Sequence, residues 1–131
     1  MERTPINPSS WSLALGFNQA ELIQGQARTL YCSGQTAMSP DGEPLHQGDM
    51  SLQLGTAVDN LESVLRQAGM TLADVVRLNV YTTDIEALLP YYGVLAGRLA
   101  AARTAPATTM LEVSRLAIPG QLVELEATAV A

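Results

Sequence analysis

Two predicted strands near the C-terminus decide the fold, and they read PATTMLEVS over residues 106–114 and LVELEATAV over residues 122–130. Because side chains alternate between the faces of a strand, Thr108, Met110 and Glu112 share one face of the first strand. In the second strand Glu124 and Glu126 share one face, and hydrophobic residues occupy the other. The two glutamates are therefore either an acid–base pair or the polar outer face of a half-buried sheet, and for Glu126 we favour the outer face.

Hydrophobic periodicity and turn residues predict the elements before this pair. The helix over 49–68 rests on Leu54, Val58, Leu61 and Leu65, which recur at helical spacing, and Gly69 ends it. We expect the first two strands to pair as an antiparallel hairpin, after an extended or irregular segment over residues 1–12. The predicted elements, in chain order, are strands over 17–23 and 29–33, a helix over 49–68, a strand over 74–81, a turn over 84–88 and a helix over 89–102. Thr83 and Glu86 have the spacing of a capping box for that turn.

This order predicts one two-layer α+β domain over residues 1–131, with two helices on one face of a mostly antiparallel sheet. The second face of such a sheet needs cover. Only 15% of the residues are charged, which is low for a protein surface that faces water everywhere. Both points favour self-association.

Composition excludes several function classes. The seven basic residues are all arginines and the net charge is −6, which disfavours nucleic-acid binding and rules out a lysine Schiff base within the chain. Cys32 is the single cysteine and His46 the single histidine, so we predict no metal site, no cofactor and no local catalytic triad. The sequence shows no signal peptide or membrane-spanning stretch, and we expect a cytoplasmic protein without membrane partners.

Several short motifs resemble those of the Rid family, also called YjgF/YER057c/UK114. They are the Ser33-Gly34-Gln35 turn, the Ala68-Gly69-Met70 turn and the segment from Pro106 to Glu126. The resemblance implies a chorismate-mutase-like α+β domain that assembles as a homotrimer with a small-molecule cleft between neighbouring subunits. It also implies a departure, because the deaminating members read Pro, Ala, Arg where this chain reads Pro106, Ala107 and Thr108.

The resemblance assigns Glu124 to catalysis, as the group that positions water for attack on an imine carbon. The substrate-binding residues that it implies are Phe17, Ser33, Gly34, Leu89, Thr108, Met110 and Glu112. Glu112 is either a pocket residue or an acid that bonds to the backbone. Thr108 carries no charge, and losing a charged contact to a substrate carboxylate costs about 2–5 kcal/mol. Arg103 either replaces that cation or, as we favour, lies in solvent at a helix C-terminus.

We therefore predict a Rid-like hydrolase or deaminase that acts on an enamine, imine or related reactive carbon–nitrogen compound. Thr108 argues against the standard 2-aminoacrylate activity. Phe17, Leu89 and Met110 make the cleft less polar than in the family. Because the cleft would hold Glu112 and Glu124 but no arginine, it would repel a carboxylate, and a neutral or amine-bearing ligand is expected. The alternative is a trimeric binding or regulatory protein without turnover. Ribonuclease activity, a label that some relatives carry, is disfavoured by the acidic composition.

Overall fold

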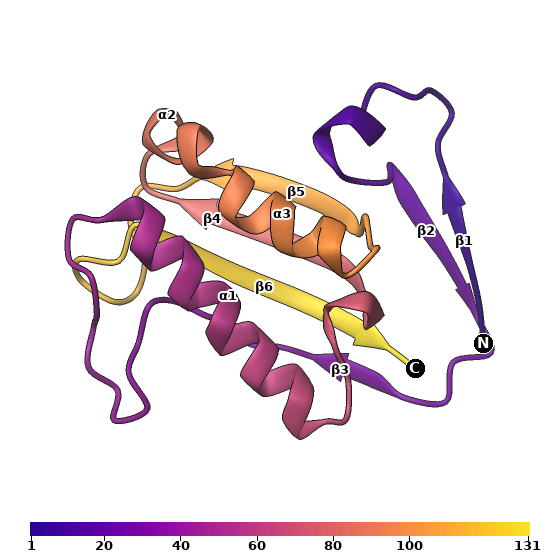
Figure 1. The fold of residues 1–131 in the computed structure, drawn as a ribbon, viewed down its shortest axis with the longest axis horizontal. Helices are drawn as coiled ribbons and strands as arrows, with labels where there is room; N and C mark the ends of the chain where they lie inside the picture. The colour runs from indigo at the N-terminus through magenta and orange to yellow at the C-terminus, as the bar shows by residue number, and fades with distance from the viewer.

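The main sheet has four strands in the order β3, β6, β4, β5, and the computed structural model describes all residues 1–131. The strands are β3 (Thr29–Tyr31), β6 (Val123–Val130), β4 (Val75–Thr82) and β5 (Ala107–Glu112). β6 pairs antiparallel with both β3 and β4, whereas β4 and β5 run parallel. The sheet is thus mostly antiparallel, as predicted, and β5 forms one edge (Figure 1).

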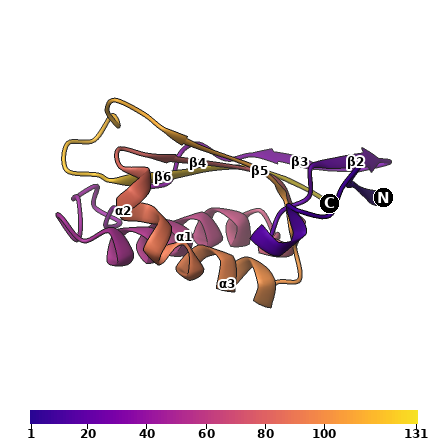
Figure 2. The ribbon, with the colours of Figure 1, turned by 90° about the horizontal axis from the view of Figure 1, so that it is seen from above.

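All helices lie on one face of this sheet, and the opposite face has no covering layer (Figure 2). The long helix α1 (Met50–Gln67) begins after Asp49, whose Oδ1 accepts a hydrogen bond of 2.9 Å from the Leu52 N–H. It ends at Gly69, which has a φ of +72°. The prediction for this helix is therefore confirmed, including its glycine terminator.

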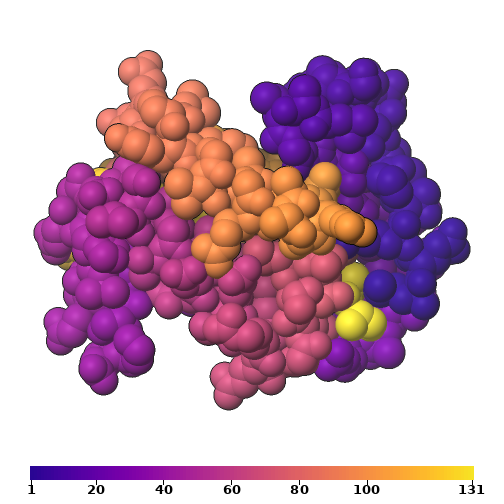
Figure 3. All heavy atoms as spheres, in the orientation of Figure 1, coloured from indigo at the N-terminus to yellow at the C-terminus, as the bar shows by residue number.

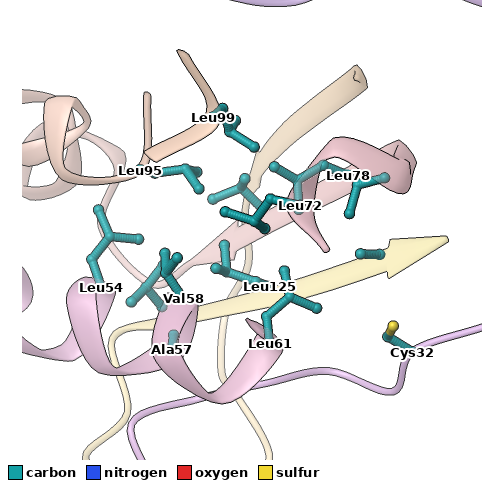
Figure 4. Packing of buried hydrophobic residues seen from close by; sticks show 14 of the residues in the cluster. Cys32, Leu54, Ala57, Val58, Leu61, Leu72, Leu78, Leu95, Leu99 and Leu125 are labelled. Atoms are coloured by element: carbon teal, nitrogen blue, oxygen red, sulfur yellow. The ribbon is translucent and has the colours of Figure 1, made fainter. Parts of the chain in front are cut away.

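The core lies between the helices and the covered face of the sheet (Figure 4). Its fully buried side chains alternate along β4 and β6 as the sequence pattern predicts. The largest of them are Leu54, Leu61, Leu65, Leu78, Leu88, Leu95 and Leu125. Cys32 is also buried at the edge of this cluster, and burial raises the pKa of its thiol.

The predicted N-terminal hairpin is wrong in its pairing. Strand β2 (Ala20–Gln24) pairs with β1 (Glu2–Ile6), which lies in the segment expected to be extended or irregular. β3 pairs with β6 instead, because the Ala27 and Arg28 N–H groups both donate to the Ala131 carbonyl, at 2.9 and 2.8 Å. These bonds carry the chain away from β2 and start the antiparallel ladder with the C-terminal strand.

The second long helix starts later than predicted. Residues 85–102 form a short helix α2 (Ile85–Leu88), a 3₁₀ turn η3 (Leu89–Tyr91) and the helix α3 (Gly93–Ala101). Pro90 has no N–H to donate and lies in the 3₁₀ turn, so the α-helical ladder resumes only after it. Asp84, not Thr83, caps α2, and its carboxylate accepts a hydrogen bond from the Ala87 N–H.

The longest helix, α1, carries Asp59, Glu62 and Arg66, and none of the helices combines the length and the hydrophobicity of a membrane span.

Candidate functional site

An apolar pocket lies on the helix side of the sheet, where four of the predicted site residues meet. Phe17 comes from the loop before β2, Leu89 from η3, and Thr108 and Met110 from β5. Leu15 and Tyr92 complete a lining that encloses about 260 Å³. Figure 3 shows the corresponding notch between the indigo N-terminal segment and the orange α2–α3 segment. The hydrophobic walls leave two hydroxyl groups, on Thr108 and Tyr92, as the polar features of the pocket.

The Thr108 hydroxyl can accept a hydrogen bond from a ligand but has no proton to offer one. Its Oγ1 donates to the Pro106 carbonyl at 2.8 Å, so only its lone pairs remain. The Tyr92 hydroxyl forms no hydrogen bond with the protein, and burial raises the pKa of its phenol, which keeps the proton in place. The pocket therefore presents one acceptor and one neutral hydroxyl and no charge.

The other predicted residues, Ser33, Gly34 and Glu124, come together on the uncovered side of the sheet. The Glu124 carboxylate lies directly over Gly34, where an added Cβ would approach Glu124 Cδ to 2.6 Å and Cγ to 2.9 Å. Only glycine allows this close approach. Glu124 has no hydrogen-bond partner in the protein, so both of its oxygens are free to bind water or a ligand.

The sheet itself separates these two groups of residues. Thr108 and Met110 pair in register with Leu78 and Val80, which point into the core. Glu124 pairs with Tyr81, which belongs to the alternate, uncovered face of β4. One chain therefore carries two half-sites: the apolar pocket on the covered face, and Glu124 with Ser33 and Gly34 on the uncovered face.

Glu126 lies on the same face as Glu124, but its carboxylate is hydrogen-bonded within the protein. Its Oε1 accepts hydrogen bonds from Asn79 Nδ2 at 2.8 Å and from the Tyr81 hydroxyl at 3.1 Å. Burial, and then the hydrogen bond to Glu126, raise the pKa of Tyr81. These bonds agree with the structural role favoured for Glu126 from the sequence, which did not identify Asn79 and Tyr81 as the partners.

Glu112 and Arg103 lie outside both half-sites. The Glu112 carboxylate accepts a hydrogen bond of 3.0 Å from the Ile85 N–H, so it is the backbone-bonding acid of the two alternatives. Arg103 lines a different cavity, beyond the C-terminal end of α3. No three His, Cys, Asp or Glu side chains come together as metal ligands would.

Sequence reasoning missed Leu15 and Tyr92 as pocket residues. Leu15 precedes Phe17 by two residues, and Tyr92 follows Leu89 by one helical turn. A search for apolar neighbours of the predicted residues at those spacings would have found both.

A family model described as Endoribonuclease L-PSP matches residues 13–131. The crystal structure of the Rid family protein YyfB from Yersinia pestis superimposes with a TM-score of 0.83 and 35% identity over 100% of both chains. The mitochondrial protein mmf2 of Schizosaccharomyces pombe is 37% identical over 86 residues, which are 66% of this chain and 64% of that protein. A 2-iminobutanoate/2-iminopropanoate deaminase of Rattus norvegicus is 34% identical over 84 residues, or 63% of this chain and 59% of that enzyme.

The matches to mmf2 and to the rat deaminase thus span less than two thirds of the length of those two relatives. The match to YyfB is complete, and it confirms the predicted chorismate-mutase-like α+β fold. The chain belongs to the Rid (YjgF/YER057c/UK114) family.

Proposed function

We propose that the protein is a Rid-like hydrolase that deaminates a neutral or amine-bearing imine or enamine in a cleft between two subunits of a homotrimer. The apolar pocket of one subunit would hold the body of the substrate, and Glu124 of its neighbour would face the reacting carbon. The observation that carries the proposal is the chemistry of the pocket: apolar walls, an acceptor at Thr108, and no cation.

A second copy of the chain is the simplest way to unite the half-sites. Within one chain the sheet keeps Thr108 and Glu124 apart, and the uncovered face also exposes Tyr31 (80%) and Leu111 (48%). Exposed apolar side chains beside an unpaired carboxylate favour burial against a partner. The rat relative named as a 2-iminobutanoate/2-iminopropanoate deaminase supports the reaction class.

The pocket argues against a 2-imino acid as the substrate. A carboxylate placed beside Thr108 would meet oxygen lone pairs and hydrocarbon, and a buried unpaired charge is strongly unfavourable. An imine N–H would instead donate to Thr108 Oγ1, and the carboxylate of Glu124 from the neighbouring subunit would balance the charge of an ammonium group. This preference agrees with Phe17, Leu89 and Met110, whose side chains offer no polar group.

The chemical step needs one base and one water molecule. Glu124 accepts a proton from the water as its oxygen attacks the carbon of the C=N bond and returns that proton to the nitrogen, which gives a carbinolamine. Glu124 then takes the proton of the new hydroxyl group and passes it to the nitrogen as the C–N bond breaks, so that ammonia leaves and the carbonyl forms. The free oxygens of Glu124 suit it to this role, whereas Glu126 is already occupied by Asn79 and Tyr81.

The test compares two imines with the same phenyl body. A flavin amine oxidase generates the neutral imine of benzaldehyde from benzylamine, and an amino acid oxidase generates the 2-imino acid from phenylalanine. We expect the protein to accelerate ammonia release from the neutral imine only, and Glu124→Gln to abolish the acceleration. Faster turnover of the imino acid would contradict the proposal.

The alternative, a binding protein without turnover, makes a different prediction in the same experiment. Its supporting observation is that Glu124 has no second catalytic group within hydrogen-bond distance. Saturable binding of benzylamine without acceleration of either hydrolysis would establish it in place of the hydrolase.

A further inference from the structure

A second cavity lies between the N-terminal hairpin and the C-terminal end of α3. It is a solvent-open depression of about 390 Å³, with Arg103 exposed on its wall, and it shares no lining residue with the apolar pocket. Arg3 and Glu21, on β1 and β2, line one wall, and Arg103 and Thr104, just after α3, line the other. In Figure 3 the orange end of α3 meets the indigo N-terminal segment in this part of the molecule.

One of its two arginines is fully engaged. The Arg3 guanidinium donates to both Glu21 carboxylate oxygens, at 3.0 and 3.2 Å, and to Thr104 Oγ1 at 3.0 Å. Glu21, whose side chain is only 4% exposed, also accepts a hydrogen bond of 2.8 Å from Asn18. Arg3 and Glu21 thus neutralise each other and join the hairpin to the rest of the domain.

Arg103 is different because its guanidinium has no hydrogen bond or ion pair with the protein. Five of the seven arginines have such partners, and only Arg103 and Arg115 do not. Because the charges of Arg3 and Glu21 cancel, Arg103 gives the cavity one net positive charge, although the whole chain has a net charge of −6. The five N–H donors of Arg103 are available to a ligand.

The backbone conformation of Arg103 also sets this residue apart. Both long helices end in the same motif: Met70 N–H donates to Leu65 O after α1, and Thr104 N–H donates to Leu99 O after α3. The motif requires a left-handed residue, which glycine supplies at least cost. α1 uses Gly69, with φ +72°, but α3 uses Arg103, with φ +55°. An arginine in a glycine position is a local conflict of the kind found at functional sites.

We propose that this cavity is a second binding site, for a small organic carboxylate held by Arg103. The planar guanidinium matches a carboxylate with two parallel hydrogen bonds. Pro5, Ala100 and Ala105 supply apolar wall for a short hydrocarbon portion. With a single free cation, the site matches a monoanion better than a phosphate dianion.

The test is an NMR titration of the full chain with propionate at constant ionic strength, observing the backbone amide resonances of Thr104 and Ala105 in every variant and the Arg103 Nε–Hε resonance in the wild type. We expect a saturable shift at Arg103. Arg103→Gly should weaken propionate binding about tenfold or more, because the bidentate contact is lost. Arg103→Lys should weaken it less, since charge remains without the fork, and Arg115→Ala should leave it unchanged.

Arg103→Gly also separates binding from folding. Glycine fits the left-handed position, so the melting temperature should equal or exceed that of the wild type. The proposal is overturned if propionate produces no saturable shift, if Arg103→Gly and Arg115→Ala bind it equally, or if inorganic phosphate saturates Arg103 where propionate does not.

Discussion

The two faces of the main sheet carry opposite halves of the candidate site. The covered face supplies an uncharged pocket in which Thr108 and Met110 lie among apolar side chains. The uncovered face supplies Glu124, with both oxygens free, above Gly34. The same four-stranded sheet presents both faces, and side-chain alternation along β5 and β6 assigns each of these residues to one of them. Under the proposed function, this divided site is complete only when a second chain brings the other face to it.

The largest expected effect distinguishes the two glutamates of the uncovered face. If catalysis rests on Glu124, Glu124→Gln should lower turnover by about 10²–10⁴-fold, the usual contribution of a general base. Its stability should hardly change because Glu124 has no partner in the protein. Glu126→Ala should do the reverse, losing about 1–3 kcal/mol of unfolding free energy with its bonds to Asn79 and Tyr81 while turnover persists. Steady-state kinetics and chemical denaturation of both variants measure the contrast, and equal effects on both quantities would refute it.

Gly34→Ala should be next in size. Its Cβ would overlap the Glu124 side chain and displace the carboxylate, and we expect a loss of about tenfold or more in turnover, as for other misplaced catalytic groups. Gly97→Ala is the matched control, because no atom lies within 4 Å of the added Cβ and alanine favours helix α3. If the two alanine variants turned over at the same rate, the close approach at Gly34 would have no role in function.

A pair of neighbouring threonines tests the covered face. Thr108 points into the pocket, whereas Thr109 points to the other face and accepts a hydrogen bond from Arg77. Thr108→Val should weaken the binding of an amine-bearing ligand by roughly three- to tenfold, corresponding to one hydrogen bond of about 0.5–1.5 kcal/mol. Calorimetric titration should find no such change for Thr109→Val. A larger loss of affinity in Thr109→Val would place the ligand on the uncovered face and contradict binding in the apolar pocket.

The smallest effect concerns Tyr92 and alkaline pH. Burial raises its pKa above the ordinary value of 10.0, so the folded state retains the proton that the unfolded state releases first. The stability of the wild type should therefore fall as the pH rises from 10 through the raised pKa, and Tyr92→Phe should lose less over the same window. Melting temperatures across that range, with Tyr91→Phe as the control for an exposed neighbour, provide the measurement. Identical pH profiles for wild type and Tyr92→Phe would contradict burial of the phenol.

The sequence predicted the phase of β4, β5 and β6 but not the partners of the strands. Alternation correctly separated Thr108 and Met110 from Thr109, and Val123 and Leu125 from Glu124. Pairing depends on long-range backbone bonds, such as those to the Ala131 carbonyl, which no local pattern records. For that reason β2 and β3 were expected to form a hairpin that does not exist.

The same limit explains what the sequence could show of the site. Phe17, Leu89, Thr108 and Met110 were predicted as pocket residues, and they line one cavity. The family motifs grouped Glu124 with these four residues. Whether side chains of β5 and β6 share a face depends on how each strand pairs with β4, and the sequence did not reveal that register. Glu112 shares a face with Thr108 and Met110, yet the nearby start of α2 binds its carboxylate.

Mixed oligomers test the divided site most directly. Leu89 is 55% exposed, so Leu89→Trp can fill the pocket from its rim, and Glu124→Gln removes the base from the other face. Each variant alone should be inactive. If subunits exchange randomly in equal amounts, about one quarter of all sites in the exchanged population of trimers pair an intact pocket with an intact Glu124 from the neighbour. Recovery of about that fraction of wild-type turnover is the predicted result. No recovery in oligomers shown by native mass spectrometry to be mixed would contradict the account.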